Sequence, residues 1–380
     1  MKIYGNVVAP ENAGYGFVEY ENGKITAVEI VEDVRSEADW ILPGFIDVHL
    51  HGMFDGEASA EKVHLMAQHE PSTGVVRFCP ASASEPHENI SAFIRRVREL
   101  VENPMPGCAL IHGSHLEGPF LEYVHRGGMN ENYIRKPDPE ETAEWLEEGG
   151  GTVKIMTIAP ELPDADKVIA KLIENGVIAS AGHSAMNIEE LQHFVEIGGR
   201  GICHLYDAHD GREVYNCVVQ PSAADAILMD DRLFVELILD GVHVPEMLVR
   251  LSIRTAGAKR IIGITDSLLG AGDPYGEYPM LDAGRSFHFK DGVFRLVEDD
   301  DVIVGSALTM NVVFYNLCNK FGCNPVESAW MTSGNAARYL GIDSFTGSLQ
   351  KGLNADIAVL GSDMLTVKKT ILNGDVIYGN

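Results

Sequence analysis

The middle of the chain alternates between short apolar runs and amphipathic runs, and this alternation restricts the possible folds more than any other feature. Eight apolar runs have the character of buried strands: 44–50, 75–79, 109–112, 153–158, 177–181, 201–205, 233–239 and 260–264. Amphipathic runs with helical spacing separate most of them: 90–101, 139–148, 164–174, 188–197 and 245–256. Eight alternating strand and helix units over about 250 residues are typical of a TIM (β/α)8 barrel. The sequence therefore predicts an α/β fold built on such a barrel.

Both ends of the chain have a different character. Short strand-like runs at 3–8, 16–20 and 24–30 are separated by turns, and the stretch from 347 to 378 resembles them. We expect a small β-sandwich domain formed by residues 1–42 plus 346–380, with the barrel domain, 43–345, inserted between its halves. Residues 278–304 interrupt the barrel pattern and predict a β-hairpin insertion around Asp291-Gly292. The runs 311–321 and 325–339 predict closing helices.

Charge and composition exclude several classes of protein. The formal net charge of -27 argues against binding to nucleic acid or to an anionic membrane, which both require clustered basic residues. No segment approaches the ~20 apolar residues of a membrane helix, and the first residues lack the apolar run of a secretory signal. The six cysteines show no CxxC spacing, and Cys79, Cys108 and Cys203 lie in apolar runs, as small core residues do. We expect a cytoplasmic protein with free thiols.

Polar residues with metal-binding chemistry follow the predicted strands at their carboxyl ends. His49 and His51 are two residues apart on the first strand, so their side chains point the same way. In a TIM barrel all carboxyl ends of the strands meet at one mouth. The complete candidate set comprises His49, His51, Glu117, His183, His204 and Asp266. Four imidazoles and two carboxylates form a ligand set suited to zinc or iron.

Each of these residues also has an ordinary structural interpretation. His183 after Gly182 could be a turn residue, and Asp266 could be the N-cap of a helix. Glu117 before Gly118-Pro119 could be a solvated loop carboxylate. The gathering of unconnected histidines at one end of one barrel favours the metal site over these separate explanations.

The spacing around the barrel suggests how the ligands are divided. Glu117, His183 and His204 would hold one divalent ion. His49 and His51 would hold a second, with Glu117 as a possible bridge and Asp266 as a further oxygen ligand. Such an ion lowers the pKa of its bound water to about 7 and polarises a carbonyl group. Asp266 would take the proton as the metal-bound hydroxide attacks and then deliver it to the departing nitrogen, which is the hydrolysis of an amide.

Motifs along nearly the whole chain resemble one enzyme family. They are HxH at 49–51, HLEGPF at 115–120, GHS at 182–184, HLY at 204–206, DGVHV at 240–244, TDS at 265–267, GSALTM at 305–310 and GSLQKGLNADIAVL at 347–360. The chain is similar here to the N-acetylglucosamine-6-phosphate deacetylases of the amidohydrolase superfamily. The resemblance implies a TIM barrel with a β-sandwich, a homodimer, and the removal of acetate from a sugar-phosphate amide.

The resemblance also implies roles for individual residues. Glu117 would replace the carboxylated lysine that other branches carry on strand four, where Lys154 lies too early in its strand to reach the site. His243 would orient the sugar. Arg212 would reach the phosphate from the partner subunit, since a guanidinium binds phosphate bidentately. A solvated loop arginine is the alternative for Arg212.

The match departs from the family pattern at the substrate end. Asp207 replaces an asparagine in Tyr206-Asp207-Ala208, where a carboxylate should repel a phosphate. Met129 stands where the family has a histidine, and His125 or His209 could compensate. The loop from His204 to Arg212 is shorter than usual. The candidate substrate-binding residues are His243, Arg212, Asp207, Ala208 and Met129.

These observations predict a deacetylase that hydrolyses the acetamide of N-acetylglucosamine 6-phosphate to glucosamine 6-phosphate and acetate. It would use one or two divalent ions, with zinc the first choice and iron the second. Two alternatives remain: an amidohydrolase of the same branch acting on a galacto-configured or unphosphorylated N-acetyl amino sugar, or a non-catalytic sugar-phosphate binder. The intact set from His49 to Asp266 disfavours a binder, which needs no general base.

Overall fold

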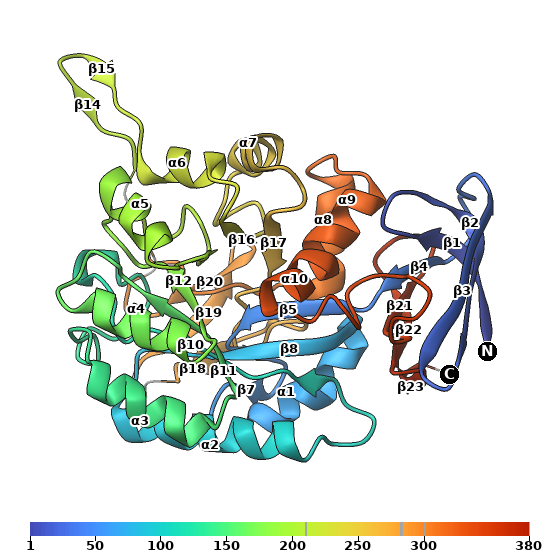
Figure 1. Cartoon of the computed structure of the whole chain (residues 1–380), viewed down its shortest axis with the longest axis horizontal. Coiled ribbons are helices and arrows are strands. Elements are labelled where there is room, and N and C mark those ends of the chain that lie inside the picture. Colours follow the sequence, from blue (N-terminus) through green and yellow to red (C-terminus); the bar gives the residue numbers. More distant parts are fainter. Residues whose placement is uncertain (210, 282–283, 300, 380) are drawn as a thin grey trace.

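The computed structural model describes residues 1–209, 211–281, 284–299 and 301–379. It has a large α/β barrel and a smaller sheet domain, and both ends of the chain lie in the smaller one (Figure 1). Five positions of the predicted regions lie outside the described residues: 210 in the loop after strand six, 282, 283 and 300 in the insertion, and 380 in the terminal domain.

The barrel is formed by strands that are almost entirely buried, as Val- and Ile-rich parallel strands are. Eight strands of the described chain follow one another as neighbours and pair in parallel: β5 (Phe45–Leu50), β8 (Val75–Ser82), β10 (Ser114–Glu117), β11 (Val153–Ile158), β12 (Ile178–Ala181), β13 (Gly201–Ile202), β16 (Phe234–Ile238) and β17 (Ile261–Ile264). Backbone hydrogen bonds from Asp266 N to His49 O (2.9 Å) and from His51 N to Ser267 O (2.8 Å) join the last strand to the first. The prediction of a TIM barrel is confirmed.

The third strand begins later than the sequence pattern indicates. The predicted run 109–112 contains only the short strand β9 (Leu110–Ile111), which pairs with β8. The strand that continues the barrel is β10, which pairs with both β8 and β11. Three of its four residues are polar and yet buried, so an apolar run does not reveal it. As a result, Glu117 is the last residue of a barrel strand and lies at the mouth.

Helices cover the outside of the barrel (Figure 1). They are α1 (Val63–His69), α2 (His87–Glu102), α3 (Pro139–Gly149), α4 (Ala165–Glu174), α5 (Ile188–Glu196), α6 (Ala223–Met229), α7 (Glu246–Ala256), α8 (Met310–Asn319), α9 (Pro325–Ala329) and α10 (Asn335–Leu340). Their starts carry ordinary signals: Asp138 caps α3, and Asn187 and Glu190 form a capping box on α5. Between α9 and α10 the chain makes one π-helical turn, Trp330–Gly334. The short helices α1 and α6 were not predicted.

The insertion after the eighth strand is larger than the predicted hairpin. Within the described residues it is a three-stranded antiparallel sheet of β18 (Glu277–Pro279), β19 (Ser286–Lys290) and β20 (Val293–Leu296). The predicted turn is present, with Asp291 and Gly292 both at positive φ, as a type I′ turn requires. Phe287 and Phe294 pack in one cluster with Met53 and Leu269, which follow the first and eighth strands. The insertion is therefore fixed to the mouth of the barrel.

The smaller domain is one sheet made from both ends of the chain. Its seven described strands have the order β23-β22-β21-β4-β1-β2-β3, with bounds β1 (Lys2–Val8), β2 (Ala13–Glu21), β3 (Lys24–Glu32), β4 (Trp40–Pro43), β21 (Ile357–Leu360), β22 (Val367–Leu372) and β23 (Asp375–Tyr378). Apolar residues of both arms, including Val18, Ile25, Ile357 and Ile371, share one core. We propose the division at 1–42 plus 346–380 and 43–345; the strands obey it except for Pro43, the last residue of β4.

Two short antiparallel ribbons complete the described structure. One consists of β6 (Gly52–Met53) and β7 (Gly56–Glu57), next to the first strand. The other consists of β14 (Val214–Tyr215) and β15 (Val218–Val219) and projects from the body of the molecule (Figure 1). Among the described residues, no helix combines the length and the apolar character needed to cross a membrane.

Candidate metal centre and active site

The carboxylate of Glu117 is the centre of the site, and four imidazoles surround it. Its Oε1 atom lies 2.8 Å from His204 Nε2, 3.1 Å from His183 Nε2 and 3.5 Å from His49 Nε2. Its Oε2 atom lies 3.0 Å from His51 Nε2. The structure therefore brings these predicted residues together from four different barrel strands or strand ends, all of them buried.

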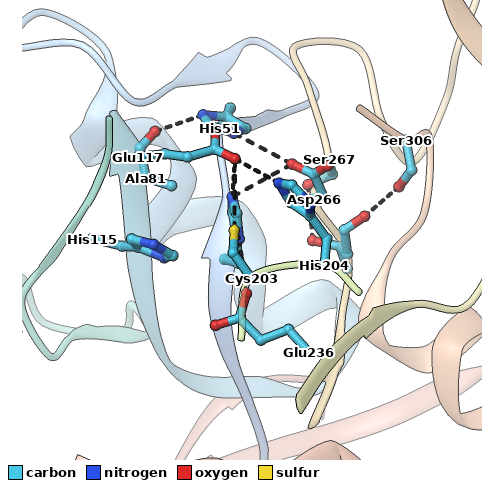
Figure 2. A network of polar contacts seen from close by, with 12 residues as sticks. His51, Ala81, His115, Glu117, Cys203, His204, Glu236, Asp266, Ser267 and Ser306 are labelled. Atoms are coloured by element: carbon cyan, nitrogen blue, oxygen red, sulfur yellow. Dashed lines mark hydrogen bonds and ion pairs between the residues drawn. The ribbon is translucent and has the colours of Figure 1, made fainter. Parts of the chain in front are cut away.

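The other ring nitrogen of each histidine is held by a separate acceptor. His51 Nδ1 donates to Ala81 O at 2.8 Å, His183 Nδ1 to His125 O at 2.7 Å, and His204 Nδ1 to Asp207 O at 3.2 Å. His49 Nδ1 lies 3.1 Å from the Glu236 carboxylate. Figure 2 shows the contact of His51 with Ala81. These contacts fix each ring so that Nε2 faces Glu117. Metal-binding histidines in proteins are oriented by partners of this kind.

Three of the site residues have an unusual backbone conformation. The φ angles are 50° at His183, 20° at His204 and 47° at Asp266. Residues other than glycine seldom adopt positive φ, and such residues cluster at functional sites where the surrounding structure holds them in place. Here the chain turns sharply at the ends of three strands, and the turn directs each side chain over the mouth of the barrel.

The carboxylates of Glu117 and Asp266 at the mouth of the barrel stabilise positively charged groups beside them. Burial would raise the pKa of Glu117, but the surrounding imidazoles outweigh it and hold the pKa well below its usual value. Burial lowers the pKa of His51, yet its contacts with Asp266 and Glu117 raise the pKa to about 9. A buried anion stabilises a neighbouring proton or metal cation in the same way.

Asp266 lies next to the two histidines of the first strand. Its Oδ1 atom is 3.3 Å from His51 Nε2 and 3.6 Å from His49 Nε2. Burial would raise the pKa of Asp266, but the bond to His51 and the nearby imidazoles lower it overall, so the carboxylate is charged. Below the site, burial raises the pKa of Asp47 to about 7, while its carboxylate accepts from Thr265 Oγ1 at 2.6 Å and His49 N at 3.1 Å.

Several groups of side chains at this mouth fit a metal ion. Within the described residues there are four such groups, and in each of them all ligand atoms lie within 4.8 Å of one another. The groups are His49 with Glu117, Cys203 and His204; His49 with His51 and Asp266; His49 with His115 and Glu236; and His204 with Asp207 and Asp266. His183 joins none of them and reaches the site through Glu117. Nitrogen and oxygen donors in this number suit zinc or iron. His49 Nε2 is buried and makes no hydrogen bond to a described residue, as a nitrogen reserved for a cation would be.

A pocket opens above these residues, and together with the solvent at its mouth it holds about 790 Å³ of space free of atoms. His51, Glu117, His183, His204 and Asp266 form part of its lining, and so do Asp207 and Met129. The opposite wall comes from the insertion sheet and the loop after strand eight, including Leu268, Met280 and Phe287. A substrate in this pocket would meet the candidate metal ligands and Asp266 directly.

The remaining predicted substrate residues lie at different depths. His243 is bound to Asp240 through Nδ1 at 2.6 Å, and its buried Nε2 has no hydrogen-bond partner in the part of the chain that is described. Ala208 is half-buried, with φ at 55°, and its carbonyl accepts from Ser184 N at 3.2 Å. Arg212 is exposed and does not line the pocket; its guanidinium forms an ion pair with Asp225.

Sequence reasoning left three residues of the four candidate metal groups out of the site: His115, which it used only as part of a motif, Glu236 and Cys203. Glu236 is the one charged residue of the apolar strand β16, and that exception was the available signal. Cys203 was interpreted as a core residue; it is buried, but its Sγ atom lies 3.6 Å from His49 Nδ1 and 3.8 Å from Glu117 Oε1. The prediction for Lys154 agrees with the geometry, since its ammonium group donates to Gly151 O before the strand.

Comparison with known proteins gives one consistent result. A profile of the amidohydrolase family matches residues 40–377. An N-acetylglucosamine-6-phosphate deacetylase of Lysinibacillus sphaericus is 32% identical over 351 residues, covering 91% of this chain and 87% of that one. An N-acetylgalactosamine-6-phosphate deacetylase of Escherichia coli O157:H7 is 29% identical and covers 90% of each chain. The crystal structure of the N-acetylglucosamine-6-phosphate deacetylase from Thermotoga maritima aligns over the full length of both chains, with a TM-score of 0.88 and 30% identity.

Proposed function

We propose a function from one premise: the chain belongs to the amidohydrolase family, among relatives of the N-acetylglucosamine-6-phosphate deacetylases, and is a hydrolase that acts on amides. From this premise we propose that it removes acetate from N-acetylglucosamine 6-phosphate and releases glucosamine 6-phosphate. The observation that carries the proposal is the convergence of four histidine Nε2 atoms on Glu117, with Asp266 beside them at the floor of a pocket.

We propose that this convergence is a divalent metal centre, with zinc as the first candidate and iron as the second. Glu117, His183 and His204 would hold one ion, and His49 and His51 would take part in a second position. Bound there, a divalent ion supplies a Lewis acid that polarises the amide carbonyl and acidifies water. The donor atoms and the unsatisfied His49 Nε2 support the assignment.

Asp266 is the proposed proton carrier. Its carboxylate is charged and faces the pocket, so it can accept a proton from the attacking water and deliver it to the departing nitrogen. The contact with His51 holds Oδ1 in place at 3.3 Å. His243, oriented by Asp240, would bind the sugar through its unpartnered Nε2.

One residue favours a second substrate. The Asp207 carboxylate lies within 4.8 Å of ligand atoms of His204 and Asp266 and lines the pocket, so it would face a bound anion. An unphosphorylated N-acetyl amino sugar would avoid this repulsion, and a galacto-configured one would present its hydroxyl groups differently to the pocket. The similarity to an N-acetylgalactosamine-6-phosphate deacetylase supports testing that configuration.

We propose that the enzyme acts as a homodimer in the cytoplasm. The projecting ribbon β14–β15 exposes Val214, Tyr215, Val218 and Val219, each at least 59% accessible. Exposed apolar side chains in this number mark an interaction surface, and a second copy of the chain is the proposed partner.

Arg212 precedes the ribbon, so contact between subunits would bring its guanidinium towards the partner's pocket. An exposed thiol such as Cys217 stays reduced in the cytoplasm.

An acetate-release assay tests the function. Zinc-loaded protein should release acetate from N-acetylglucosamine 6-phosphate with a higher kcat/KM than from its galacto epimer or from either unphosphorylated sugar. A higher value for another substrate in the panel would transfer the assignment to that sugar. Binding of the phosphorylated sugar without acetate release would leave a non-catalytic binder.

A further inference from the structure

We infer that Arg285 binds the phosphate of the substrate from within the same chain, at the pocket wall opposite the candidate metal ligands. The inference rests on the proposed function and assigns a position to the anionic end of the sugar. Among the described residues that line the pocket, Arg285 is the only lysine or arginine. Arg212, to which the resemblance assigns the phosphate, does not line the pocket of its own chain.

The charge of the pocket explains why an anionic substrate needs a cation at this wall. Four carboxylates belong to the described lining, those of Glu57, Glu117, Asp207 and Asp266. The whole chain carries a formal net charge of -27, so its overall field also repels an anion. A phosphate therefore requires local positive charge to bind, and the guanidinium of Arg285 is the permanent positive charge that the described wall provides.

The geometry of the insertion sheet directs Arg285 into the pocket. Arg285 directly precedes strand β19, and its carbonyl accepts from Met280 N at 3.0 Å. Side chains alternate between the two faces of a strand, so Arg285 and Phe287 point to the same face, and both line the pocket. Ser286 lies between them and donates from Oγ to Glu277 Oε1 at 2.6 Å on the other face.

A second contact fixes the direction of the guanidinium. Arg285 Nη2 donates to Gly128 O at 2.9 Å, in the loop that also contributes Met129 to the pocket. This loop is itself held close to the insertion, because a Cβ atom at Gly128 would lie only 2.4 Å from Val304 Cγ1. Arg285 is half-buried, and a charged group that is already oriented and partly shielded from water binds an anion at a lower entropic cost than a flexible surface chain.

The arrangement matches the chemistry of a hexosamine 6-phosphate. The acetamide is attached to C2 of the sugar and the phosphate to C6, on opposite sides of the ring. With the amide at the floor beside Asp266, the ring crosses the pocket and the phosphate extends towards the wall formed by the insertion sheet. The guanidinium of Arg285 can donate two parallel hydrogen bonds to phosphate oxygens. Arg285 would therefore select phosphorylated over neutral sugars.

Steady-state kinetics of Arg285→Gln test the inference, because glutamine retains N–H donors and removes the charge. We expect KM for the phosphorylated sugar to rise about 10–100-fold, while kcat and the KM for the unphosphorylated sugar stay within about twofold. Arg285→Lys retains the charge and should raise KM by less than about tenfold. The matched control is Arg295→Gln, which alters a half-buried arginine of the same sheet that does not line the pocket and should change neither KM.

The outcomes separate this inference from the proposed function. An unchanged KM for the phosphorylated sugar, or equal increases for both sugars, would overturn the role of Arg285 and leave the deacetylase proposal intact. If no sugar releases acetate, the proposed function fails, and calorimetric titration with inorganic phosphate decides: the unaltered protein should bind it at least about tenfold more tightly than Arg285→Gln. Equal Kd values, or no binding to either protein, would contradict the inference.

A measurement on the unaltered protein covers the case in which Arg285→Gln does not fold. Phenylglyoxal modifies arginine side chains, and mass spectrometry locates the modified positions. Inorganic phosphate should slow the modification of Arg285 and leave the rate at the exposed Arg232 unchanged. An equal rate at Arg285 with and without phosphate would overturn the inference.

Discussion

The metal side and the substrate side of the barrel mouth are built in different ways. On the metal side, each histidine is buried and contacts both Glu117 and a second acceptor. On the substrate side, Asp207 and Ala208 are half-buried, and Arg212 is exposed with an ion pair of its own. Residues that all contact one another tolerate few substitutions, whereas the residues of a loop can be substituted one at a time. The departures from the family pattern accordingly lie on the substrate side. For this reason the type of reaction is easier to infer from this chain than the identity of the substrate.

The strongest test of the metal side is Glu117→Gln, which keeps the shape of the side chain and removes its charge. Metal content should fall to near zero and kcat/KM by more than about 10⁴-fold, because metal and proton-transfer chemistry are lost together. Elemental analysis and the acetate assay measure the two effects. The control is Glu147→Gln on the exposed face of α3, and retention of metal and activity by Glu117→Gln would contradict the proposed centre.

The next effect concerns Asp266→Asn, which removes the proton carrier. We expect kcat to fall by roughly 10²–10⁴-fold, the usual contribution of a general acid or base, with little change in the Kd of the substrate. Single-turnover kinetics and equilibrium binding separate these quantities. Turnover within tenfold of the unaltered enzyme would exclude Asp266 from proton transfer.

A smaller effect is expected on the substrate side from Arg212→Ala. Losing a charge-assisted contact to phosphate should raise KM for the phosphorylated sugar by roughly 10–100-fold and leave the unphosphorylated sugar unaffected. Arg232→Ala is the matched control, since Arg232 forms a similar exposed ion pair with Asp230. Equal KM changes for both sugars would show that Arg212 supports the fold of the loop and does not bind phosphate.

The smallest effect is predicted for Asp207→Asn. Removing one negative charge at the pocket should lower KM for the phosphorylated sugar by about fivefold. This factor corresponds to the interaction energy of two unit charges in water at contact distance. Steady-state assays at low and high salt measure it, because salt should reduce the difference. An increase in KM would mean that the Asp207 carboxylate contributes to substrate binding.

The sequence predicted those features that depend on periodic patterns and on strand ends. Eight apolar runs and their spacing predicted the barrel, and the carboxyl-end rule placed His49, Glu117, His183, His204 and Asp266 at one mouth. Strand three was misplaced because polar residues such as Ser114 and His115 occupy buried positions within it. The contact of Cys203 with Glu117 depends on packing across the barrel, and no local pattern encodes it. The three-stranded insertion was recognised only in part, since its first strand has three residues.

A side-chain hydrogen bond at the seam between the last and the first strand has a consequence for assembly. Thr265 and Asp47, which are 218 residues apart in the chain, meet at the seam directly beneath His49 and Asp266. The two halves of the active site are therefore brought together by the last pairing of the cylinder, and loop-closure entropy makes such distant pairing slow. During refolding, hydrolysis should return only when the final strand docks, later than helical structure, so that recovered activity reports a completed fold.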